Sequence, residues 1–401
     1  MKIIATAASQ IREGKEVAVD TFLDALRKAT KMRGTQKQLC SVLGKSIIIG
    51  PIRGHACDFA NYLLTNVLVD TSAVNIVLLG NYIDGAHQSI EVLYLVALLI
   101  IHSGKTVVPL LGKHELLYPI QPENFGSLRN ELILRCNHSH KNIEDYEVVV
   151  RQFFASLNTA CLVENRLFCV AGGPASGYRH LEDIDSETSQ EALREFVLNE
   201  QMDEDEERIA DGNAFVSQPS EQAFRFTFNA VCNFLSRNNL VMMIIGMEYH
   251  TSRPDYDSFA RPNHYKESIY FPGFMFGRTH PDTKVPAVLT IFSAPAFCGV
   301  NRNGACLVTT SSDRIEVHEL PVYSRRPLIT PGTQDHSFSW AQPMMERAIT
   351  SILRDMVFGN IVEKHEEDVE YKHMESVATS KMRRMCHLLK SYDLPLPELP
   401  K

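Results

Sequence analysis

Short apolar runs alternate with helix-forming stretches through the first third of the chain. Each run is branched, ends in glycine and is followed by residues with helical apolar spacing. Strands buried on both faces have this composition, so the alternation predicts a mostly parallel sheet with helices outside it. In such sheets the loops after the strands form the functional site. The runs are "SIIIG" at 46–50, "NIVLLG" at 75–80 and "TVVPLLG" at 106–112.

Two helices are predicted from apolar spacing and end signals. In residues 20–33 the apolar positions follow a helical period, and Asp20 or Thr21 can cap the first turn. Gly34 follows the expected end of this helix. The apolar run 92–101 spans about half the length that a membrane helix needs, so we expect a buried helix there.

Beyond residue 160 the pattern changes to short strands with little between some of them. We interpret these strands as a second sheet that packs on the first. The expected fold class is therefore α/β, with two mixed β-sheets forming a sandwich flanked by helices. The strand-like segments are "RLFCVAGG", "LVMMIIGMEYH", "AVLTIFSAP", "GACLVTT" and "RIEVHEL".

Charged and proline-rich stretches suggest how the chain is divided. The acidic run 198–212 has few apolar residues, which is typical of a solvated, mobile insertion. A polar stretch with two prolines and a glycine after residue 323 is typical of a linker. The predicted divisions are an N-terminal helical segment at 1–45, the main domain at 46–323, the linker at 324–337, a helical arm at 338–360, and an acidic spacer, basic amphipathic helix and proline-rich tail at 361–401.

Composition and charge narrow the function classes. The chain has 401 residues and a formal net charge of −8, so nucleic-acid binding is not the expected function. The first residues hold too short an apolar stretch for a signal peptide, and the 9 cysteines include no CxxC pair. These features predict a cytoplasmic protein with reduced thiols and no membrane span.

Six short motifs occur in an order that is specific when they are taken together. They are "GPIRGH", "GNYIDGAHQSIE", "LGKHE", "AGG", "IGM" and "SAPAFC". Their order resembles that of the phosphoprotein serine/threonine phosphatase family, whose loops are GDxHGQ, GDYVDRGxxSIE, RGNHE, HGG, an Arg-x-His after a strand, and SAPNYC. Within that family the chain looks most similar to the calcineurin catalytic subunit, over about 39–358. The resemblance implies a calcineurin-like metallophosphoesterase fold.

The resemblance also implies where metal ligands lie in the family. Its members hold two metal ions that generate a hydroxide nucleophile and clamp phosphate oxygens. The ligands are carboxylate and amide oxygens and neutral imidazoles. This chain differs from the family at all six ligand positions, so the sequence predicts no metal site and no cofactor. The six positions are Pro51, Arg53, Asn81, Lys113, Ala171 and Met247.

Two of the altered positions add positive charge. Arg53 and Lys113 fall where metal ions lie in the family, and we expect each to pair with a buried carboxylate such as Asp84 or Glu115. Such pairs are expected because a buried cation without a partner is costly.

The phosphate clamp implied by the resemblance is altered as well. The two arginines that grip phosphate in the family fall on Gly85 and Ile245. Asp84 and His114, which orient the general acid in the family, are retained. We interpret this pair as a hydrogen-bonded strut between two loops, because without metal ions nothing activates the water.

The segment 338–360 resembles the arm of calcineurin that carries its EF-hand regulatory subunit. Its apolar positions cover more than half of the helix circumference, which favours a helix held in a groove. An ordinary terminal helix docked on its own domain is the alternative. The residues predicted to contact a partner are Trp340, Met344, Met345, Ala348, Ile349, Ile352, Leu353, Met356 and Val357.

Two further segments resemble partner-binding regions of calcineurin. The strand at 314–320 falls where the substrate-docking edge of its sheet lies, and a plain edge strand is the alternative. A basic amphipathic stretch near the end resembles its calmodulin-binding region, and a surface helix is the alternative. The residues predicted to bind calmodulin are Lys381, Met382, Arg383, Arg384, Met385, Leu388, Leu389 and Lys390.

Together these features predict a pseudophosphatase, a catalytically inactive, calcineurin-like scaffold that binds other proteins. The expected partner is a calcineurin-B-like EF-hand subunit or calmodulin, within a larger assembly such as a cytoskeletal one. Two alternatives stay open. One is an active or residual phosphatase with a rebuilt site. The other is a sensor that uses Arg53 and Lys113 to bind phosphate or a phosphopeptide without hydrolysis.

Overall fold

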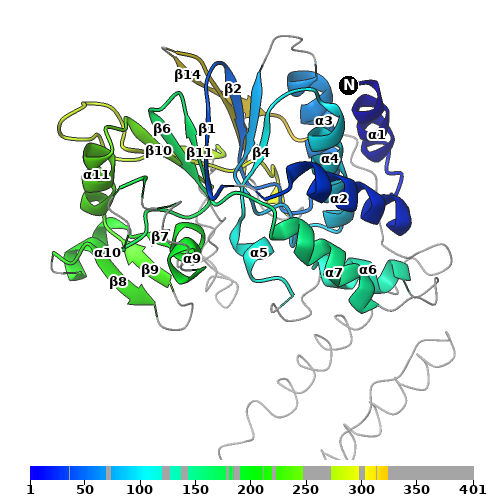
Figure 1. Cartoon of the computed structure of the whole chain (residues 1–401). Helices are drawn as coiled ribbons and strands as arrows, with labels where there is room; N and C mark the ends of the chain where they lie inside the picture. The colour runs from blue at the N-terminus through cyan, green and yellow to red at the C-terminus, as the bar shows by residue number, and fades with distance from the viewer. Residues whose placement is uncertain are drawn as a thin grey trace, which may run out of the picture. The chain divides into compact units, whose positions relative to one another are not determined.

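Three β-sheets organise the described part of the chain, as Figure 1 shows. The linker, the arm, the calmodulin-like segment and Met247 lie outside the described residues. The described residues all belong to the unit Met1–Ile329, which is separate from Thr330–Lys401. The computed structural model describes residues 1–35, 37–68, 74–119, 127–136, 143–177, 180–182, 184, 190–210, 212–218, 223–246, 272–297, 303–312 and 314–323.

The first sheet confirms the predicted parallel strands. β2, β3 and β4 are parallel neighbours, and each ends just before one of the predicted loops. β13 pairs antiparallel with the other side of β2, and β14 forms the edge, giving the order β14-β13-β2-β3-β4. The strands are β2 (Ser46–Ile49), β3 (Asn75–Leu78), β4 (Val107–Pro109), β13 (Ala305–Thr310) and β14 (Ile315–Leu320).

The second sheet corrects one prediction about strand partners. The later strands do not all form one sheet, because β13 and β14 join the first sheet through β2. The second sheet instead recruits β1 from the N-terminal region and has the order β1-β5-β6-β10-β12-β11. Its strands are β1 (Leu39–Val42), β5 (Ala160–Val163), β6 (Leu167–Val170), β10 (Met242–Gly246), β11 (Phe274–Phe276) and β12 (Val288–Ile291).

Alternate side chains of the strands face two different cores. Ile48 of β2 packs with Val77 and Ile244 in a core that combines residues of both sheets, whereas Ile47 and Ile49 pack with the helices. Because both faces are buried, the run is apolar at successive positions. The two sheets therefore form the predicted sandwich with helices outside it (Figure 1).

Helices cover the outer faces of both sheets. The buried helix predicted around 92–101 is α4, whose side chains belong to the core under the first sheet. Among the described helices, none combines the length and apolar content needed to cross a membrane. The helices are α1 (Lys2–Arg12), α2 (Val19–Arg33), α3 (Ala56–Tyr62) continued by a π-helical turn (Leu63–Val67), α4 (Ser89–His102), α5 (Lys113–Leu116), α6 (Leu128–Cys136), α7 (Ile143–Phe154), α9 (Gln190–Leu198), α10 (Glu204–Ile209) and α11 (Phe228–Arg237).

The ends of α2 agree with the prediction only in part. The helix ends at Arg33 and is followed, as predicted, by Gly34, whose positive φ of 57° suits a residue without a side chain. It begins at Val19, after Ala18, and no side chain caps it, so the expected cap from Asp20 or Thr21 is wrong. Both residues lie inside the first turn instead.

The acidic run is folded, and its interpretation as a mobile insertion is wrong. It contains strand β7 (Glu200–Gln201) and helix α10, which is capped by the side chain of Asp203. β7 pairs with β9 (Ala223–Phe226), which also pairs with β8 (Phe215–Gln218). Composition was misleading because the carboxylates of this run bond to arginines and backbone N–H groups from other parts of the chain.

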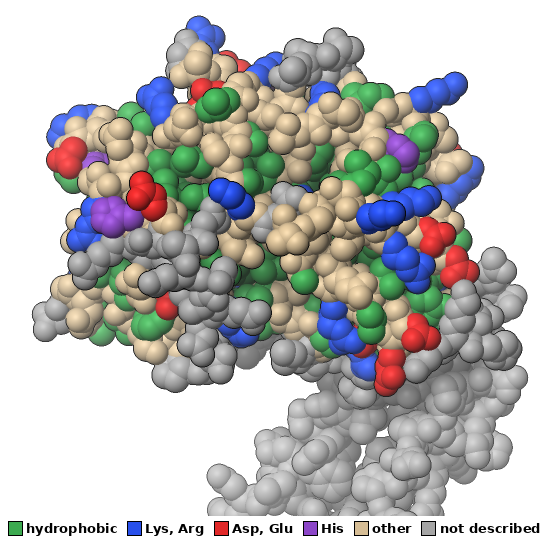
Figure 2. All heavy atoms as spheres, viewed as in Figure 1, with side chains coloured by type: hydrophobic (Ala, Val, Ile, Leu, Met, Phe, Trp, Pro, Cys, Tyr) green, Lys and Arg blue, Asp and Glu red, His purple; other side chains and the backbone are tan. Residues whose placement is uncertain are grey.

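Charge is mixed on the surface that Figure 2 shows. Acidic and basic side chains lie close to one another across the face in view, and hydrophobic side chains are scattered between them. Interspersed charges of both signs give that face no strong field of a single sign.

Candidate functional site

The loops after β2 and β3 are tied together by backbone hydrogen bonds. The N–H groups of Ile52 and Arg53 donate to the Asn81 carbonyl over 3.1 and 3.0 Å, and Gly54 N–H donates to the Tyr82 carbonyl over 2.7 Å. Gly80 has a φ of 84°, and a Cβ there would lie 2.5 Å from the Gly112 nitrogen. This glycine is therefore required for the close approach of the second and third loops.

A single carboxylate joins the second loop to the third. Glu115 Oε2 accepts N–H bonds from Asn81 and Gly112 over 2.8 and 3.0 Å, and Oε1 accepts one from Tyr82 over 2.8 Å. Burial raises the pKa of Glu115, while the neighbouring His114 and these N–H bonds act in the opposite direction. Because one carboxylate accepts N–H bonds from both loops, Glu115 fixes the position of the second loop relative to the third.

The structure brings the retained pair together. His114 Nδ1 lies 3.2 Å from Asp84 Oδ2, and the two side chains are only 9% and 12% exposed. The other carboxylate oxygen of Asp84 accepts the Leu128 N–H over 2.8 Å. The pair therefore has the geometry of a strut between loops, and it can also hold a proton on the imidazole.

Arg53 and Phe297 fill the space beside Gly85. Arg53 adopts a positive φ of 50° and donates from Nε to the Asp84 carbonyl over 2.6 Å. Its guanidinium carbon lies 5.4 Å from the centre of the Phe297 ring. A Cβ on Gly85 would lie 2.8 Å from the Arg53 carbonyl oxygen and 2.9 Å from a Phe297 ring carbon. A side chain at the clamp position therefore needs both neighbours to move.

Lys113 has a partner that the sequence did not reveal. Its Nζ lies 3.4 Å from Glu200 Oε1, and the two side chains are 19% and 20% exposed. Glu200 belongs to β7 of the acidic segment. The expected pairing with a carboxylate is thus present, but the carboxylate comes from a region whose composition indicated only solvent exposure.

Pro51 and Ala171 are both buried, and Ala171 belongs to an apolar cluster with Val197, Leu198 and Ala223. A Cβ on Gly246 would lie 3.3 Å from the Pro51 ring and 3.4 Å from the Ala171 carbonyl oxygen, so three of the predicted loops meet here. Ile245 is 5% exposed and belongs to the core beneath the second sheet. The second clamp position is therefore part of the core.

The side chains at the described positions do not fit a two-metal centre of the kind that the resemblance implies. Pro51 and Ala171 have no side-chain donor, and the Lys113 ammonium cannot ligate a cation. Asn81 Oδ1 accepts the His114 N–H over 3.2 Å. Over the described ranges, no three His, Cys, Asp or Glu side chains are grouped so that they could hold a metal ion.

The two sheets, their flanking helices and the converging loops define a calcineurin-like α/β metallophosphoesterase fold. Residues 54–246 match the family model described as "Calcineurin-like phosphoesterase". Over these residues the chain is similar to the calcineurin-like phosphoesterase family.

Two curated proteins of Saccharomyces cerevisiae (strain ATCC 204508 / S288c) are similar to this chain. The "Serine/threonine-protein phosphatase 2B catalytic subunit A1" is 25% identical over 386 residues, which cover 92% of this chain and 63% of that protein. The corresponding subunit A2 is 23% identical over 376 residues, which cover 85% of this chain and 56% of that protein. The chain thus spans about three fifths of the length of these relatives.

A solved structure shares the fold. It is the "Structure of Protein serine/threonine phosphatase from Saccharomyces cerevisiae with similarity to human phosphatase PP5", with a TM-score of 0.58 and 16% identity. The match covers 80% of this chain and 95% of that one. At this identity the likeness concerns the arrangement of helices and strands.

Proposed function

We propose that this chain is a catalytically inactive member of the calcineurin-like phosphoesterase family that acts as a protein-binding scaffold. One observation supports this more than any other: the Lys113 ammonium pairs with Glu200 at a position where the resemblance places a metal ligand. A fixed cation there repels metal ions, and the side chains of Pro51 and Ala171 offer them no donor atom.

The closed clamp position supports the same proposal. Arginine grips phosphate through two parallel N–H bonds. Gly85 provides neither bond, and the space beside it is filled by Arg53 and Phe297. A phosphate ester entering this site therefore meets neither activated water nor its usual grip.

Turnover of p-nitrophenyl phosphate by the purified chain with added Mn²⁺ tests the proposal. We expect no rate above that of buffer, and fewer than two transition-metal ions per chain by elemental analysis. The matched control is His114→Ala, which removes the imidazole of the retained Asp84–His114 pair and leaves the Lys113 and Arg53 side chains unchanged. Turnover that disappears in His114→Ala would show that the chain itself is a phosphatase.

The anion-sensor alternative requires a change in existing contacts. Lys113 is paired with Glu200, and Arg53 donates to a backbone carbonyl, so a phosphate group has to displace Glu200 or compete with it. Saturable binding of inorganic phosphate that is lost in Lys113→Ala and strengthened in Glu200→Gln favours the sensor. Binding that is absent from all three proteins favours the scaffold.

The partner that we propose is an EF-hand subunit held by the arm at 338–360, which lies outside the described residues. Two arguments support it: the wide apolar surface of the expected helix and the similarity to two proteins named as catalytic subunits, a name that implies further subunits. β14 also supports a scaffold role, because it forms the edge of the first sheet and pairs only with β13 among the described strands. An edge strand can accept an extended peptide.

A further inference from the structure

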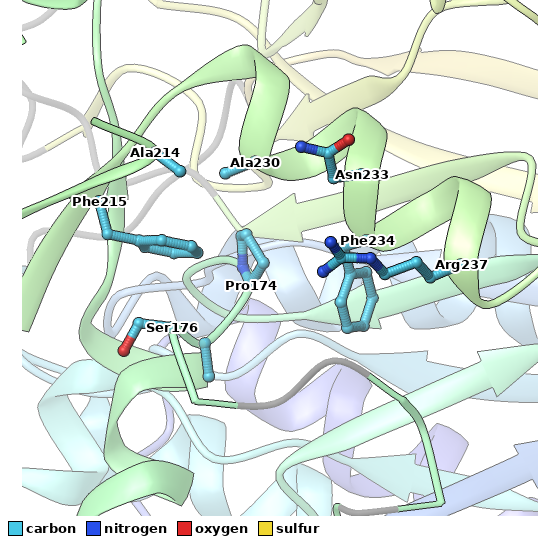
Figure 3. Close-up of a pocket in the computed structure, with 9 residues that line it drawn as sticks. Pro174, Ser176, Ala214, Phe215, Ala230, Asn233, Phe234 and Arg237 are labelled. Atoms are coloured by element: carbon cyan, nitrogen blue, oxygen red, sulfur yellow. The ribbon is translucent and has the colours of Figure 1, made fainter. Parts of the chain in front are cut away.

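A second concave site begins directly after Gly173 and is lined by none of the candidate-site residues described above. Its volume is about 210 Å³, and it opens between one face of α11, the start of β8 and the loop that follows Gly173 (Figure 3). Positions 230, 233, 234 and 237 recur at helical spacing, so one stripe of α11 forms a complete wall. The residues that line it are Pro174, Ala175, Ser176, Ala214, Phe215, Ala230, Asn233, Phe234 and Arg237.

Hydrogen bonds hold each wall of this pocket in place. Asn199 Nδ2 donates to the Pro174 carbonyl over 2.8 Å, and Ser176 N–H donates to Glu195 Oε2 over 2.6 Å. The Thr227 N–H donates to the Ala214 carbonyl over 3.0 Å. A site whose walls are already ordered loses little entropy when a ligand enters.

The polar side chains of the pocket are unengaged, in contrast to their neighbours on the same helix end. Ser236 Oγ lies 3.1 Å from His280 Nε2, and Asn238 bonds to Phe234 and Leu181. Within the described part of the chain, the Arg237 guanidinium makes no hydrogen bond or ion pair, and neither does the Asn233 side chain or the Ser176 hydroxyl.

Figure 3 shows how these groups are placed. The guanidinium of Arg237 extends toward Pro174 in the middle of the pocket, and the ring of Phe215 faces it from the opposite side. The Asn233 amide lies one helical turn before Arg237 on the same wall. A cationic fork and an amide at one end thus stand opposite an aromatic ring.

We propose that this pocket binds a carboxylate carried on an apolar body. The guanidinium of Arg237 matches a carboxylate with two N–H donors, Asn233 can donate a third bond, and Phe215 and Phe234 receive the apolar part. The volume is below that of usual drug-sized sites, which suits a small organic acid or one acidic residue with an apolar neighbour in a peptide.

A titration of the full chain with 3-phenylpropionate, followed by NMR, tests the site. The neutral analogue 3-phenylpropanamide has the same shape without the charge. We expect the acid to bind about fivefold or more tightly than the amide, and Arg237→Gln to remove that difference. Arg314→Gln is the matched control, because Arg314 is an exposed arginine, 72% accessible, just before β14 of the first sheet.

A second variant separates shape from charge. Ala214→Leu narrows the pocket while leaving Arg237 in place, so it should weaken both compounds equally. A blocked Phe-Glu dipeptide tests whether the ligand is part of a peptide. Stronger binding of the dipeptide than of 3-phenylpropionate indicates a protein partner, and stronger binding of 3-phenylpropionate indicates a small acid. Equal binding of acid and amide, no saturable binding of any probe, or an acid affinity unchanged in Arg237→Gln overturns the proposal.

Discussion

Two buried carboxylates of this chain, Glu115 and Glu131, accept hydrogen bonds from backbone N–H groups. Glu115 holds two loops of the candidate site, and Glu131 accepts N–H bonds from Ser89 and Ile90 at the start of α4 over 2.9 and 3.2 Å. The links to distant loops are not visible in the sequence, because Asn81 and Tyr82 lie more than thirty positions from Glu115, and Ser89 and Ile90 lie more than thirty positions from Glu131. A motif can show that a glutamate is retained, but only the fold shows which backbone N–H groups donate to that glutamate.

Glu131 also predicts how stability depends on pH. Burial raises the pKa of Glu131 to about 8, against the lowering effect of Arg135. The unfolded value is about 4.3, so the folded chain binds this proton more tightly. Its stabilising contribution is therefore complete below about pH 4 and is lost as the pH rises through about 8.

The measurement is urea unfolding of wild type and Glu131→Gln between pH 5 and 8. We expect the free energy of unfolding of the wild type to fall relative to Glu131→Gln by about 1 kcal/mol per pH unit. Asp205→Asn is the control, since that side chain is 82% exposed. Parallel pH profiles for wild type and Glu131→Gln would contradict the assignment.

At the scale of elements, the acidic segment 198–212 is where the structure differs most from the sequence-based prediction. Glu207 accepts the Phe228 N–H and pairs with Arg278, whose guanidinium lies 4.2 Å from the centre of the Phe228 ring. Glu206 pairs with Arg225 of β9. The charges that indicated a solvated loop are therefore the groups that attach α10 to β9 and α11.

Limited proteolysis with an enzyme that cuts after glutamate checks this assignment. We expect bonds after Glu206 and Glu207 to be cut much more slowly in the native chain than in the urea-unfolded chain. Glu207→Ala removes its own cleavage site but should speed cutting after Glu206, because it removes a charged hydrogen bond and an ion pair worth about 1–3 kcal/mol. Glu204→Ala, at the first position of the same helix, is the control. Rapid native cutting within 203–209 would support the mobile insertion instead.

The candidate site was predictable in its positions and less so in its contacts. The order of the six motifs along the chain located Pro51, Asn81 and Lys113 on loops that the structure brings together. The partner of Lys113 was not predictable, because Glu200 is 87 positions away in a segment without a motif. The positions that the resemblance assigns to metal ligands could be listed from the sequence. That Arg53 and Phe297 fill the space beside Gly85 could not, because Phe297 is far from both residues in the sequence.

For the whole molecule, the sandwich was predicted and the division of strands between its sheets was not. Hydrophobic period defines a strand and its buried faces, but it carries no information on which strand lies beside it. β13 illustrates this, because its buried pattern fits either sheet and only its register with β2 assigns it.

The separation of the chain at Ile329 predicts the behaviour of a shortened protein. A chain of residues 1–329 should unfold cooperatively with a melting temperature within about 3 °C of the full chain, because the cores described here lie within it. The full chain should co-purify with a small EF-hand protein in Ca²⁺, and the shortened chain should not.

Point variants in the full chain refine that test of the partner. Ile352→Asp lies on the expected apolar surface of the arm and should abolish co-purification, while Ser351→Asp on the polar side should leave it intact. Loss of folding in the shortened chain would contradict the separation into units. Equal capture of the EF-hand protein by both lengths would contradict the role of the arm.

The position of β13 between β2 and β14 has a consequence for synthesis on the ribosome. β2, β3 and β4 are complete once Pro109 has been made, but the strand that covers the other side of β2 begins at Ala305. At roughly 5–20 residues per second, translation of the intervening stretch takes about 10–40 s. Through that interval the nascent polypeptide exposes an uncovered apolar strand, which is the kind of segment that chaperones shield from aggregation. Production of this protein should therefore depend strongly on chaperone capacity in the host cell.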